Sequence, residues 1–208
     1  MDSPSALALL KQSYAAAVVA ADPLQIVPAY LPLPPRGRTL VVGAGKAGAS
    51  MARAVEQHWP ENAPLEGLMI TRYAHGYGGA EALQRISVVE AGHPVPDESG
   101  ETAAREIMRR VQALGPDDLL LALVSGGGSA LLSLPVEGIS MADLKATTRE
   151  LLNCGAPIQD MNTVRKHLSL IQGGKLAAMC KAPILSLVIS DVTGDEPTHI
   201  ASGPTVPD

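Results

Sequence analysis

Two glycine-rich stretches of this chain have the residue types and spacing to hold an anion. In the first, the apolar run at residues 39–42 leads into glycines arranged as G-x-G-x-x-G around Lys46. In the second, the apolar run at residues 119–124 precedes three consecutive glycines with a serine on each side. Glycine lets the backbone adopt φ > 0 and present neighbouring N–H groups to a ligand. The alternative for each stretch is a tight strand-to-helix turn without a ligand. The residues expected to bind a phosphate or nucleotide are Gly43, Gly45, Ser125, Gly126, Gly127, Gly128 and Ser129.

Lys46 distinguishes the first stretch from a dinucleotide-binding loop. Such a loop meets the pyrophosphate with its backbone, and an acidic residue after the next strand binds the ribose. Here the next apolar run, residues 67–71, is followed by Arg72 instead of an acid. A flexible ammonium in a glycine-walled turn suits a phosphate or carboxylate ligand. We therefore expect Lys46 to meet a phosphate or carboxylate; the alternative is a solvated lysine on the first turn of a helix.

Two carboxylates follow another apolar run. Asp191 and Asp195 come after residues 183–190 and are separated by a short segment that contains a glycine. Carboxylates so placed could hold Mg²⁺ or orient a hydroxyl nucleophile. We expect Asp191 to be catalytic and both aspartates to be metal ligands, with ordinary Asx turns as the alternative.

A basic segment contains Arg165, Lys166 and His167, and Asn162 precedes it. One interpretation is a solvated helix face. The other, which we adopt, is that Asn162, Arg165 and Lys166 bind the substrate. His93 lies in a proline-rich turn and could also meet substrate, but a turn histidine is more often structural or exposed, so it is left out of the catalytic set.

The apolar runs and the segments between them predict the fold that positions these residues. Strand-like runs alternating with helical patterns indicate an α/β, Rossmann-like, doubly wound and mostly parallel sheet with helices on both faces. We expect residues 1–38, an N-terminal helix and a proline-rich connection, to pack on a domain of residues 39–208. The predicted strands are 39–42, 67–71, 86–90, 119–124 and 183–190, and the predicted helices include 5–21, 49–59, 99–114 and 141–153.

Composition excludes several classes of protein. The 208 residues are 46% hydrophobic and 18% charged, which is typical of a globular protein, and without Phe the core must be aliphatic. The net charge of −5 and the lack of a basic cluster argue against nucleic-acid binding. No apolar run approaches the ~20 residues that cross a bilayer, so no membrane association is expected. Cys154 and Cys180 lack metal-ligand spacing, and Asp2 stands where a signal peptide would be basic; both observations favour a cytoplasmic protein.

The three unusual loops are expected at one edge of the sheet. In doubly wound sheets ligands bind outside the carboxyl ends of the strands, and loops 43–48, 125–130 and 191–195 all follow strands. Together they bring glycine-rich anion cradles, cations and carboxylates to one place. Phosphoryl transfer requires such a site, because it depends on positioning and charge neutralisation. The sequence contains neither a Walker pattern nor the catalytic loop of protein kinases.

Five motifs in order resemble the glycerate 2-kinase family (MOFRL type), some members of which are labelled hydroxypyruvate reductase. The resemblance covers nearly the whole chain from residue 39 onward and implies Mg²⁺- and ATP-dependent phosphorylation of D-glycerate to 2-phosphoglycerate. It also implies that Lys46 is catalytic or contacts phosphate and that the triple-glycine loop binds nucleotide or phosphate. The motifs are residues 42–47, 92–97, 125–130, 161–169, and 190–195 with 202–205.

Two features depart from the family pattern. Gln172 stands where the family usually has a lysine before a glycine pair, and the chain ends at Asp208, where the family continues into a second domain. We therefore expect an N-terminal part whose partner is the C-terminal domain of the same protein, and a homodimer through the face left uncovered. The alternatives are a hydroxypyruvate reductase that uses NAD(P)H and a non-catalytic ligand-binding fragment.

Overall fold

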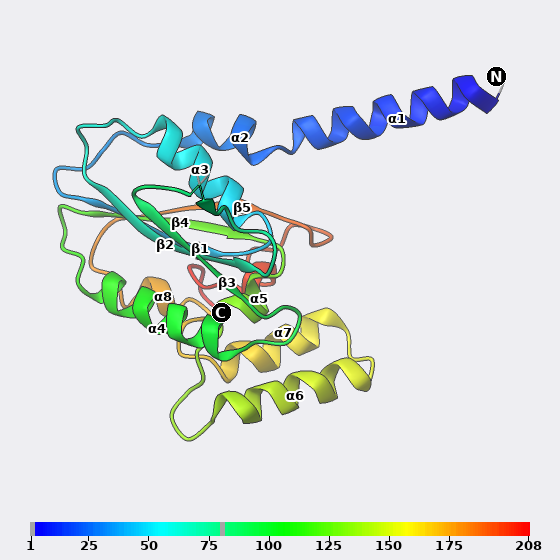
Figure 1. Cartoon of the computed structure of the whole chain (residues 1–208). Helices are drawn as coiled ribbons and strands as arrows, with labels where there is room; N and C mark the ends of the chain where they lie inside the picture. The colour runs from blue at the N-terminus through cyan, green and yellow to red at the C-terminus, as the bar shows by residue number, and fades with distance from the viewer. Residues whose placement is uncertain (1–2, 80–81) are drawn as a thin grey trace.

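A five-stranded parallel sheet lies at the centre of the computed structural model, which describes residues 3–79 and 82–208 (Figure 1). The strand order β3-β2-β1-β4-β5 and the parallel pairing of all neighbours confirm the predicted doubly wound fold. In register, Ala44 lies beside Val124, and Ser125 lies beside Ile189, so the ends of β1, β4 and β5 are level. The strands are β1 (Thr39–Ala44), β2 (Leu65–Arg72), β3 (Ile86–Ala91), β4 (Leu119–Ser125) and β5 (Ile184–Ile189).

The two central strands, β1 and β4, are buried along their whole length. Helices cover both faces of the sheet, which is why these strands are continuous apolar runs without alternation. On one face, Met51 and Val55 of α3 (Gly48–His58) and the following Trp59 pack on the sheet. On the other, Ile107 and Val111 of α4 (Glu98–Gln112) pack on the sheet. These two clusters confirm the predicted helices on both faces.

The helices begin and end close to the predicted positions. Ser140 and Asp143 form the reciprocal cap of α6, and the Asp97 carboxylate accepts a hydrogen bond from Gly100 N (3.0 Å) at the start of α4. The remaining elements are short turns and two further helices around the site. The helices are α2 (Pro23–Ile26), η1 (Val27–Tyr30), α3 (Gly48–His58), α4 (Glu98–Gln112), α5 (Gly128–Leu131), α6 (Met141–Asn153), α7 (Ile158–His167), α8 (Lys175–Ala178) and η3 (Ile200–Ser202).

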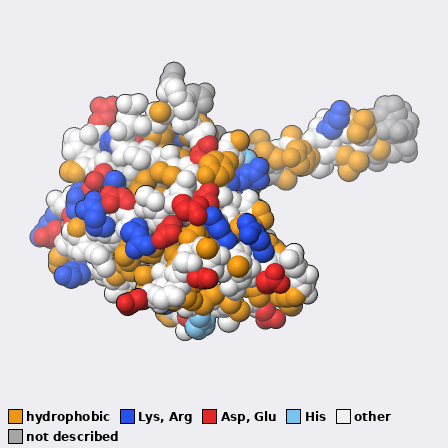
Figure 2. Space-filling view, turned by 60° about the horizontal axis from the view of Figure 1, so that its bottom comes forward, with side chains coloured by type: hydrophobic (Ala, Val, Ile, Leu, Met, Phe, Trp, Pro, Cys, Tyr) orange, Lys and Arg blue, Asp and Glu red, His pale blue; other side chains and the backbone are white. Residues whose placement is uncertain are grey.

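The N-terminal helix α1 (Ser3–Ala20) projects away from the sheet (Figure 1). The predicted packing of residues 1–38 on the domain is not seen for this helix, whereas Val27 of η1 is buried against α3. The apolar side chains of α1 stay exposed, Leu10 at 68% and Tyr14 at 73%, because the helix extends beyond the surface that α2 and η1 cover. Figure 2 shows hydrophobic side chains along this arm and mixed charges on the body. Within the described residues, no helix has the length and hydropathy to cross a membrane.

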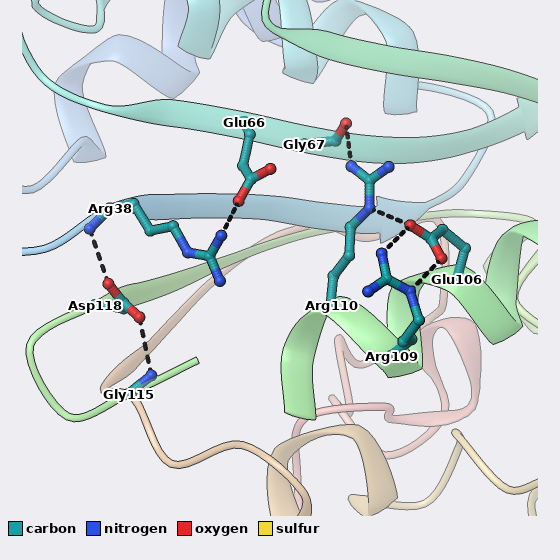
Figure 3. Close-up of polar contacts among 8 residues, drawn as sticks. All are labelled: Arg38, Glu66, Gly67, Glu106, Arg109, Arg110, Gly115 and Asp118. Carbon is teal, nitrogen blue, oxygen red and sulfur yellow. Dashed lines mark hydrogen bonds and ion pairs between the residues drawn. The ribbon is translucent and has the colours of Figure 1, made fainter. Parts of the chain in front are cut away.

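Polar contacts tie together the amino ends of the strands, opposite the loops that carry the candidate residues (Figure 3). Arg38 precedes β1, and its guanidinium forms an ion pair with Glu66 of β2 at 2.7 Å. The Asp118 carboxylate, before β4, accepts hydrogen bonds from Arg38 N and Gly115 N, each at 2.9 Å. These hydrogen bonds hold the pKa of Asp118 below its ordinary value. This edge therefore fixes where β1, β2 and β4 begin.

The outer face of α4 carries a second cluster in Figure 3. Glu106 binds the guanidinium groups of both Arg109 and Arg110 at 2.7 Å. Hydrogen bonds from the two arginines lower the pKa of Glu106 to about 2. Because these groups are on the surface, the cluster contributes little to stability.

Candidate functional site

A pocket of about 390 Å³ lies at the carboxyl ends of β1, β4 and β5. The chain runs from β1 through β2 to β3 on one side of the sheet and then crosses to β4 and β5 on the other. The point where the strand order reverses, between β1 and β4, is where doubly wound sheets bind ligands. Residues of α7 and of the segment around η3 close the pocket. Its lining includes Lys46, His93, Gly126, Gly127, Ser129, Asn162, Arg165, Asp191 and His199.

Lys46 and Asp191 form an ion pair at the mouth of this pocket. The Lys46 ammonium donates to Asp191 Oδ2 at 2.9 Å, and the two side chains are 42% and 52% exposed. The backbone joins the same loops, since Lys46 N donates to Gly126 O at 2.8 Å and Ala47 N donates to Ser125 Oγ at 3.1 Å. The structure therefore brings together the predicted catalytic residues from two loops and places them over the third.

The glycines of the triple-glycine loop leave room for other side chains of the site. A Cβ at Gly126 would lie 2.0 Å from Asp191 Oδ2, and one at Gly127 would lie 3.0 Å from the His93 ring. Gly127 also has φ +87 and caps α5, a backbone conformation that L side chains rarely adopt. The Asp191 side chain thus packs against Gly126, and the His93 ring packs against Gly127.

The glycines of the first loop pack against β4 instead of lining the pocket. A Cβ at Gly43 would lie 1.8 Å from Leu123 O, and one at Gly45 would lie 2.0 Å from Ser125 Oγ. Gly128 is likewise enclosed, with its Cβ position 2.4 Å from the Cβ of Ala201. The first loop therefore requires glycine at positions 43 and 45, because atoms of β4 approach it closely. The group of this loop that faces the pocket is the Lys46 side chain. The helix expected after the second loop is a single turn, α5, whose dipole is small.

Both the hydroxyl group and the backbone carbonyl of Ser129 accept hydrogen bonds. Its hydroxyl receives a hydrogen bond from Ser202 Oγ at 2.8 Å, and its carbonyl accepts one from Gln172 Nε2 at 2.8 Å. Gln172 Nε2 also donates to Leu132 O at 2.8 Å. The residue that replaces the family's usual lysine thus satisfies carbonyl groups of the α5 turn, and the Lys175 ammonium donates to Lys166 O at 2.8 Å at the end of α7.

Arg165 is the buried cation of the pocket. It is 8% exposed, and its Nη1 lies 3.4 Å from Asn162 Oδ1. Asn162 Nδ2 in turn donates to His199 O at 3.3 Å. Burial lowers the pKa of the Arg165 guanidinium, and no carboxylate of residues 3–79 or 82–208 pairs with it. A buried charge without a partner is unfavourable, so this arrangement favours binding of an anion.

The structure does not bring Lys166 or Asp195 into the pocket. The Lys166 ammonium is buried and paired with the carboxylate of Asp208. Asp195 lines a separate depression with Ser190 and Pro197. In the part of the chain that the structure describes, no group of three or more His, Cys, Asp or Glu is arranged to hold a metal ion.

Two histidines outside the predicted site residues line the pocket: His93, which was left out of the predicted catalytic set, and His199. Burial, together with Lys46, Arg72 and Arg165, lowers the pKa of His93, while Asp191 opposes the shift. His93 follows β3, and its position after a predicted strand was a signal for the site. His199 lies in a segment that follows no strand directly, and its buried Nδ1 has no hydrogen-bond partner among the residues that the structure describes.

Comparison with known proteins gives a consistent picture. The pattern of the family described as a domain of unknown function, DUF4147, matches residues 9–208. A putative hydroxypyruvate reductase of Agrobacterium vitis is 52% identical over 205 residues, which cover 98% of this chain and 46% of that protein. The glycerate 2-kinase of Pyrococcus horikoshii is 49% identical over 173 residues, covering 83% of this chain and 38% of that protein.

Among solved structures, the crystal structure of glycerate kinase from Thermotoga maritima matches with a TM-score of 0.82 and 36% sequence identity. The match covers 99% of this chain and 49% of that one. The chain thus spans about half the length, or less, of the relatives it matches.

Proposed function

Because the chain belongs to the DUF4147 family, as the resemblance to glycerate 2-kinases led us to expect, we propose that it functions in ATP-dependent phosphorylation of D-glycerate to 2-phosphoglycerate. One observation carries the proposal. Two cations from distant segments, Lys46 and the buried Arg165, line one pocket beside the triple-glycine loop, and Asp191 is the carboxylate between the loops. Such a site can bind two anionic groups, the phosphates of a nucleotide and the carboxylate of a small acid.

In this proposal Lys46 stabilises charge on the transferred phosphoryl group. Its ammonium lies at the pocket mouth, where Asp191 holds it in place. Positioned cations lower the barrier to phosphoryl transfer by neutralising charge that spreads over the phosphoryl oxygens. The pocket-facing part of residues 126–129 contributes backbone groups beside it.

Arg165 binds the carboxylate of D-glycerate, and Asn162 orients the guanidinium. Arginine presents several donors in a fixed planar arrangement that matches a carboxylate. Because Arg165 is buried without a carboxylate partner within the described residues, a bound acid would complete its contacts. The substrate contact predicted for Lys166 and the metal contact predicted for Asp195 stay predictions.

The pocket fits a Mg²⁺ ion that arrives with a nucleotide. Such ions take one or two protein carboxylates and complete their shell with phosphate oxygens and water. Asp191 is the carboxylate in position to serve. When bound, the ion would neutralise phosphate charge. The Asp191 carboxylate would then contact either Lys46, as it does in this structure, or the ion.

The whole activity is also proposed to require a further domain. The relatives and solved structures are about twice as long as this chain. A second domain of the same protein would supply the opposite wall and further cations.

The reductase name of one relative makes hydroxypyruvate reduction the competing activity. A coupled assay on the complete gene product separates the two. We expect D-glycerate with Mg²⁺-ATP to yield ADP and 2-phosphoglycerate, and hydroxypyruvate to leave NADH and NADPH unoxidised. Nicotinamide oxidation without ADP formation would overturn the kinase proposal.

Calorimetry on the 208-residue chain tests the remaining alternative, that this chain is a non-catalytic ligand-binding fragment. Heat of binding with D-glycerate or Mg²⁺-ATP is expected from the intact pocket. Binding without any turnover of the complete gene product would support the fragment reading and contradict the proposed activity.

A further inference from the structure

The imidazole of His93 lies in the pocket with both ring nitrogens free. The ring packs over Gly127, whose Cβ position is 3.0 Å from His93 Nε2 and 3.4 Å from Lys46 Cγ. His93 and Lys46 therefore both lie against the same glycine. Within residues 3–79 and 82–208, neither nitrogen of this ring has a hydrogen-bond partner.

Burial and the nearby cations favour the neutral ring of His93. Burial lowers its pKa, and Lys46 after β1, Arg72 at the end of β2 and Arg165 on α7 act in the same direction. Asp191 is the opposing charge and is bound to Lys46. The lowered pKa means that the imidazole is uncharged at neutral pH, with one nitrogen as a donor and the other as an acceptor.

Two other polar side chains of the pocket, Asn162 and Ser129, already have hydrogen-bond partners. Asn162 uses its oxygen toward Arg165 and its nitrogen toward His199 O. The Ser129 hydroxyl is paired with Ser202. His93 is thus a neutral group that can accept a hydrogen bond from a ligand without breaking an existing contact.

We propose that His93 contacts the substrate and accepts a hydrogen bond from the hydroxyl group that is phosphorylated, while Arg165 holds the carboxylate. This inference rests on the proposed function and makes it more specific. The charged anchor would fix one end of the acid, and His93 would select ligands with a hydroxyl next to the carboxylate. The substrate class is then the 2-hydroxy acids.

Two ligands test this inference, D-glycerate and 3-hydroxypropionate, which lacks the 2-hydroxyl group. Dissociation constants are measured by calorimetry for wild type, His93→Ala and His93→Gln. We expect His93→Ala to bind D-glycerate about 3- to 10-fold more weakly and 3-hydroxypropionate with unchanged affinity. His93→Gln, whose amide oxygen accepts hydrogen bonds, should recover part of the loss. His167→Ala, an exposed histidine on α7, is the matched control.

An equal loss for both ligands, or no loss for either, would overturn the role of His93. If a variant fails to fold, the imidazole resonances of the wild type decide. D-glycerate should shift those of His93 and leave those of His167 in place, whereas 3-hydroxypropionate should shift His93 less; equal shifts would contradict the inference.

The same measurements separate this inference from the proposed function. Wild-type protein that binds D-glycerate with the predicted ligand dependence, but whose complete gene product forms no ADP, would overturn the kinase activity alone. Wild-type protein that binds no D-glycerate would overturn both.

Discussion

The Lys46 ammonium lies 2.9 Å from Asp191 Oδ2, although 145 positions separate the two residues in the chain. Lys46 follows β1 and Asp191 follows β5, and β4 lies between these strands in the sheet. The pair therefore spans the end of β4, directly over Gly126. An interaction across three strand ends depends on the parallel register that brings those ends level.

Replacing Lys46 by alanine should abolish most activity and leave the fold intact. We expect kcat/KM of the complete gene product to fall by a factor equivalent to the loss of about 2–4 kcal/mol of transition-state stabilisation. The free energy of unfolding should change by less than about 1 kcal/mol, because the pair is half-exposed. Kinetics with D-glycerate and urea unfolding measure the two effects, with the exposed Lys181→Ala as control. Wild-type kcat/KM in Lys46→Ala would refute the catalytic role.

Gly126→Ala should separate activity from stability. The new Cβ would lie 2.0 Å from Asp191 Oδ2, and a half-exposed carboxylate can turn away from it. Gly126 does not need a positive φ, so the backbone tolerates alanine. We expect an unfolding free energy within about 0.5 kcal/mol of wild type. The kcat/KM should fall about tenfold or more, equivalent to about 1.4 kcal/mol.

Gly78→Ala is the control, since a Cβ there meets nothing within 4 Å. Full activity in Gly126→Ala would mean that the position of Asp191 does not matter for the reaction.

Arg165→Met and Lys166→Met, on adjacent residues, should have opposite effects. Arg165 is buried without a carboxylate partner within the described residues, so Arg165→Met should leave stability unchanged or raise it by about 1 kcal/mol. The same change should weaken D-glycerate binding by about 1.5–3 kcal/mol, the range for a hydrogen bond to a charged group. Lys166→Met breaks the pair with Asp208 and should lower stability by about 1 kcal/mol while binding is unaffected.

Calorimetry and urea unfolding of both variants check this contrast. Weaker D-glycerate binding by Lys166→Met would instead support the substrate contact predicted for Lys166 from the sequence.

Gln172→Ala should destabilise the α5 turn. Its Nε2 donates to the carbonyl groups of Ser129 and Leu132. Ser129 O would keep its hydrogen bond from Ser133 Oγ, whereas Leu132 O would lose the bond from Gln172. A buried carbonyl left unpaired costs about 1–3 kcal/mol, so we expect a loss of about 1–3 kcal/mol in the free energy of unfolding. Chemical denaturation measures it, with the exposed Gln112→Ala as control. A loss no larger than that of the control would show that water or relaxation satisfies these groups.

Asp118→Ala should lower stability in a pH-dependent way. Its carboxylate accepts two backbone hydrogen bonds, and the loss of both should cost about 1–3 kcal/mol at pH 7. Those bonds lower the pKa of Asp118, so the ionised form is the stabilising one. The contribution is present above the unfolded pKa of about 3.9 and is lost as the pH falls through the folded value.

Urea unfolding at pH 7 and pH 3 should therefore give a smaller difference between wild type and Asp118→Ala at the lower pH. Asp117→Ala, next to it and exposed, is the control. A difference that grows at pH 3 would contradict the assignment.

The sheet and the edge that carries the site could be predicted from the sequence, because both follow from local pattern. Strands covered on both faces must be apolar throughout, so β1 and β4 are recognisable as runs of adjacent apolar residues. In parallel sheets every strand ends at the same edge, so the loops after β1, β4 and β5 had to lie together. The Ser140 and Asp143 cap was equally predictable, since its groups are close in the chain.

The tertiary structure alone decided which side chains of those loops meet. Arg165 and Lys166 are adjacent in sequence, yet one turns to the pocket and the other to Asp208, because successive residues of a helix point about 100° apart. Asp191 and Asp195 also lie apart, because the turn between them carries one to the pocket and the other to a separate depression. The fit of Gly126 under Asp191 and of Gly127 under His93 depends on contacts between distant segments, which spacing in one segment does not encode.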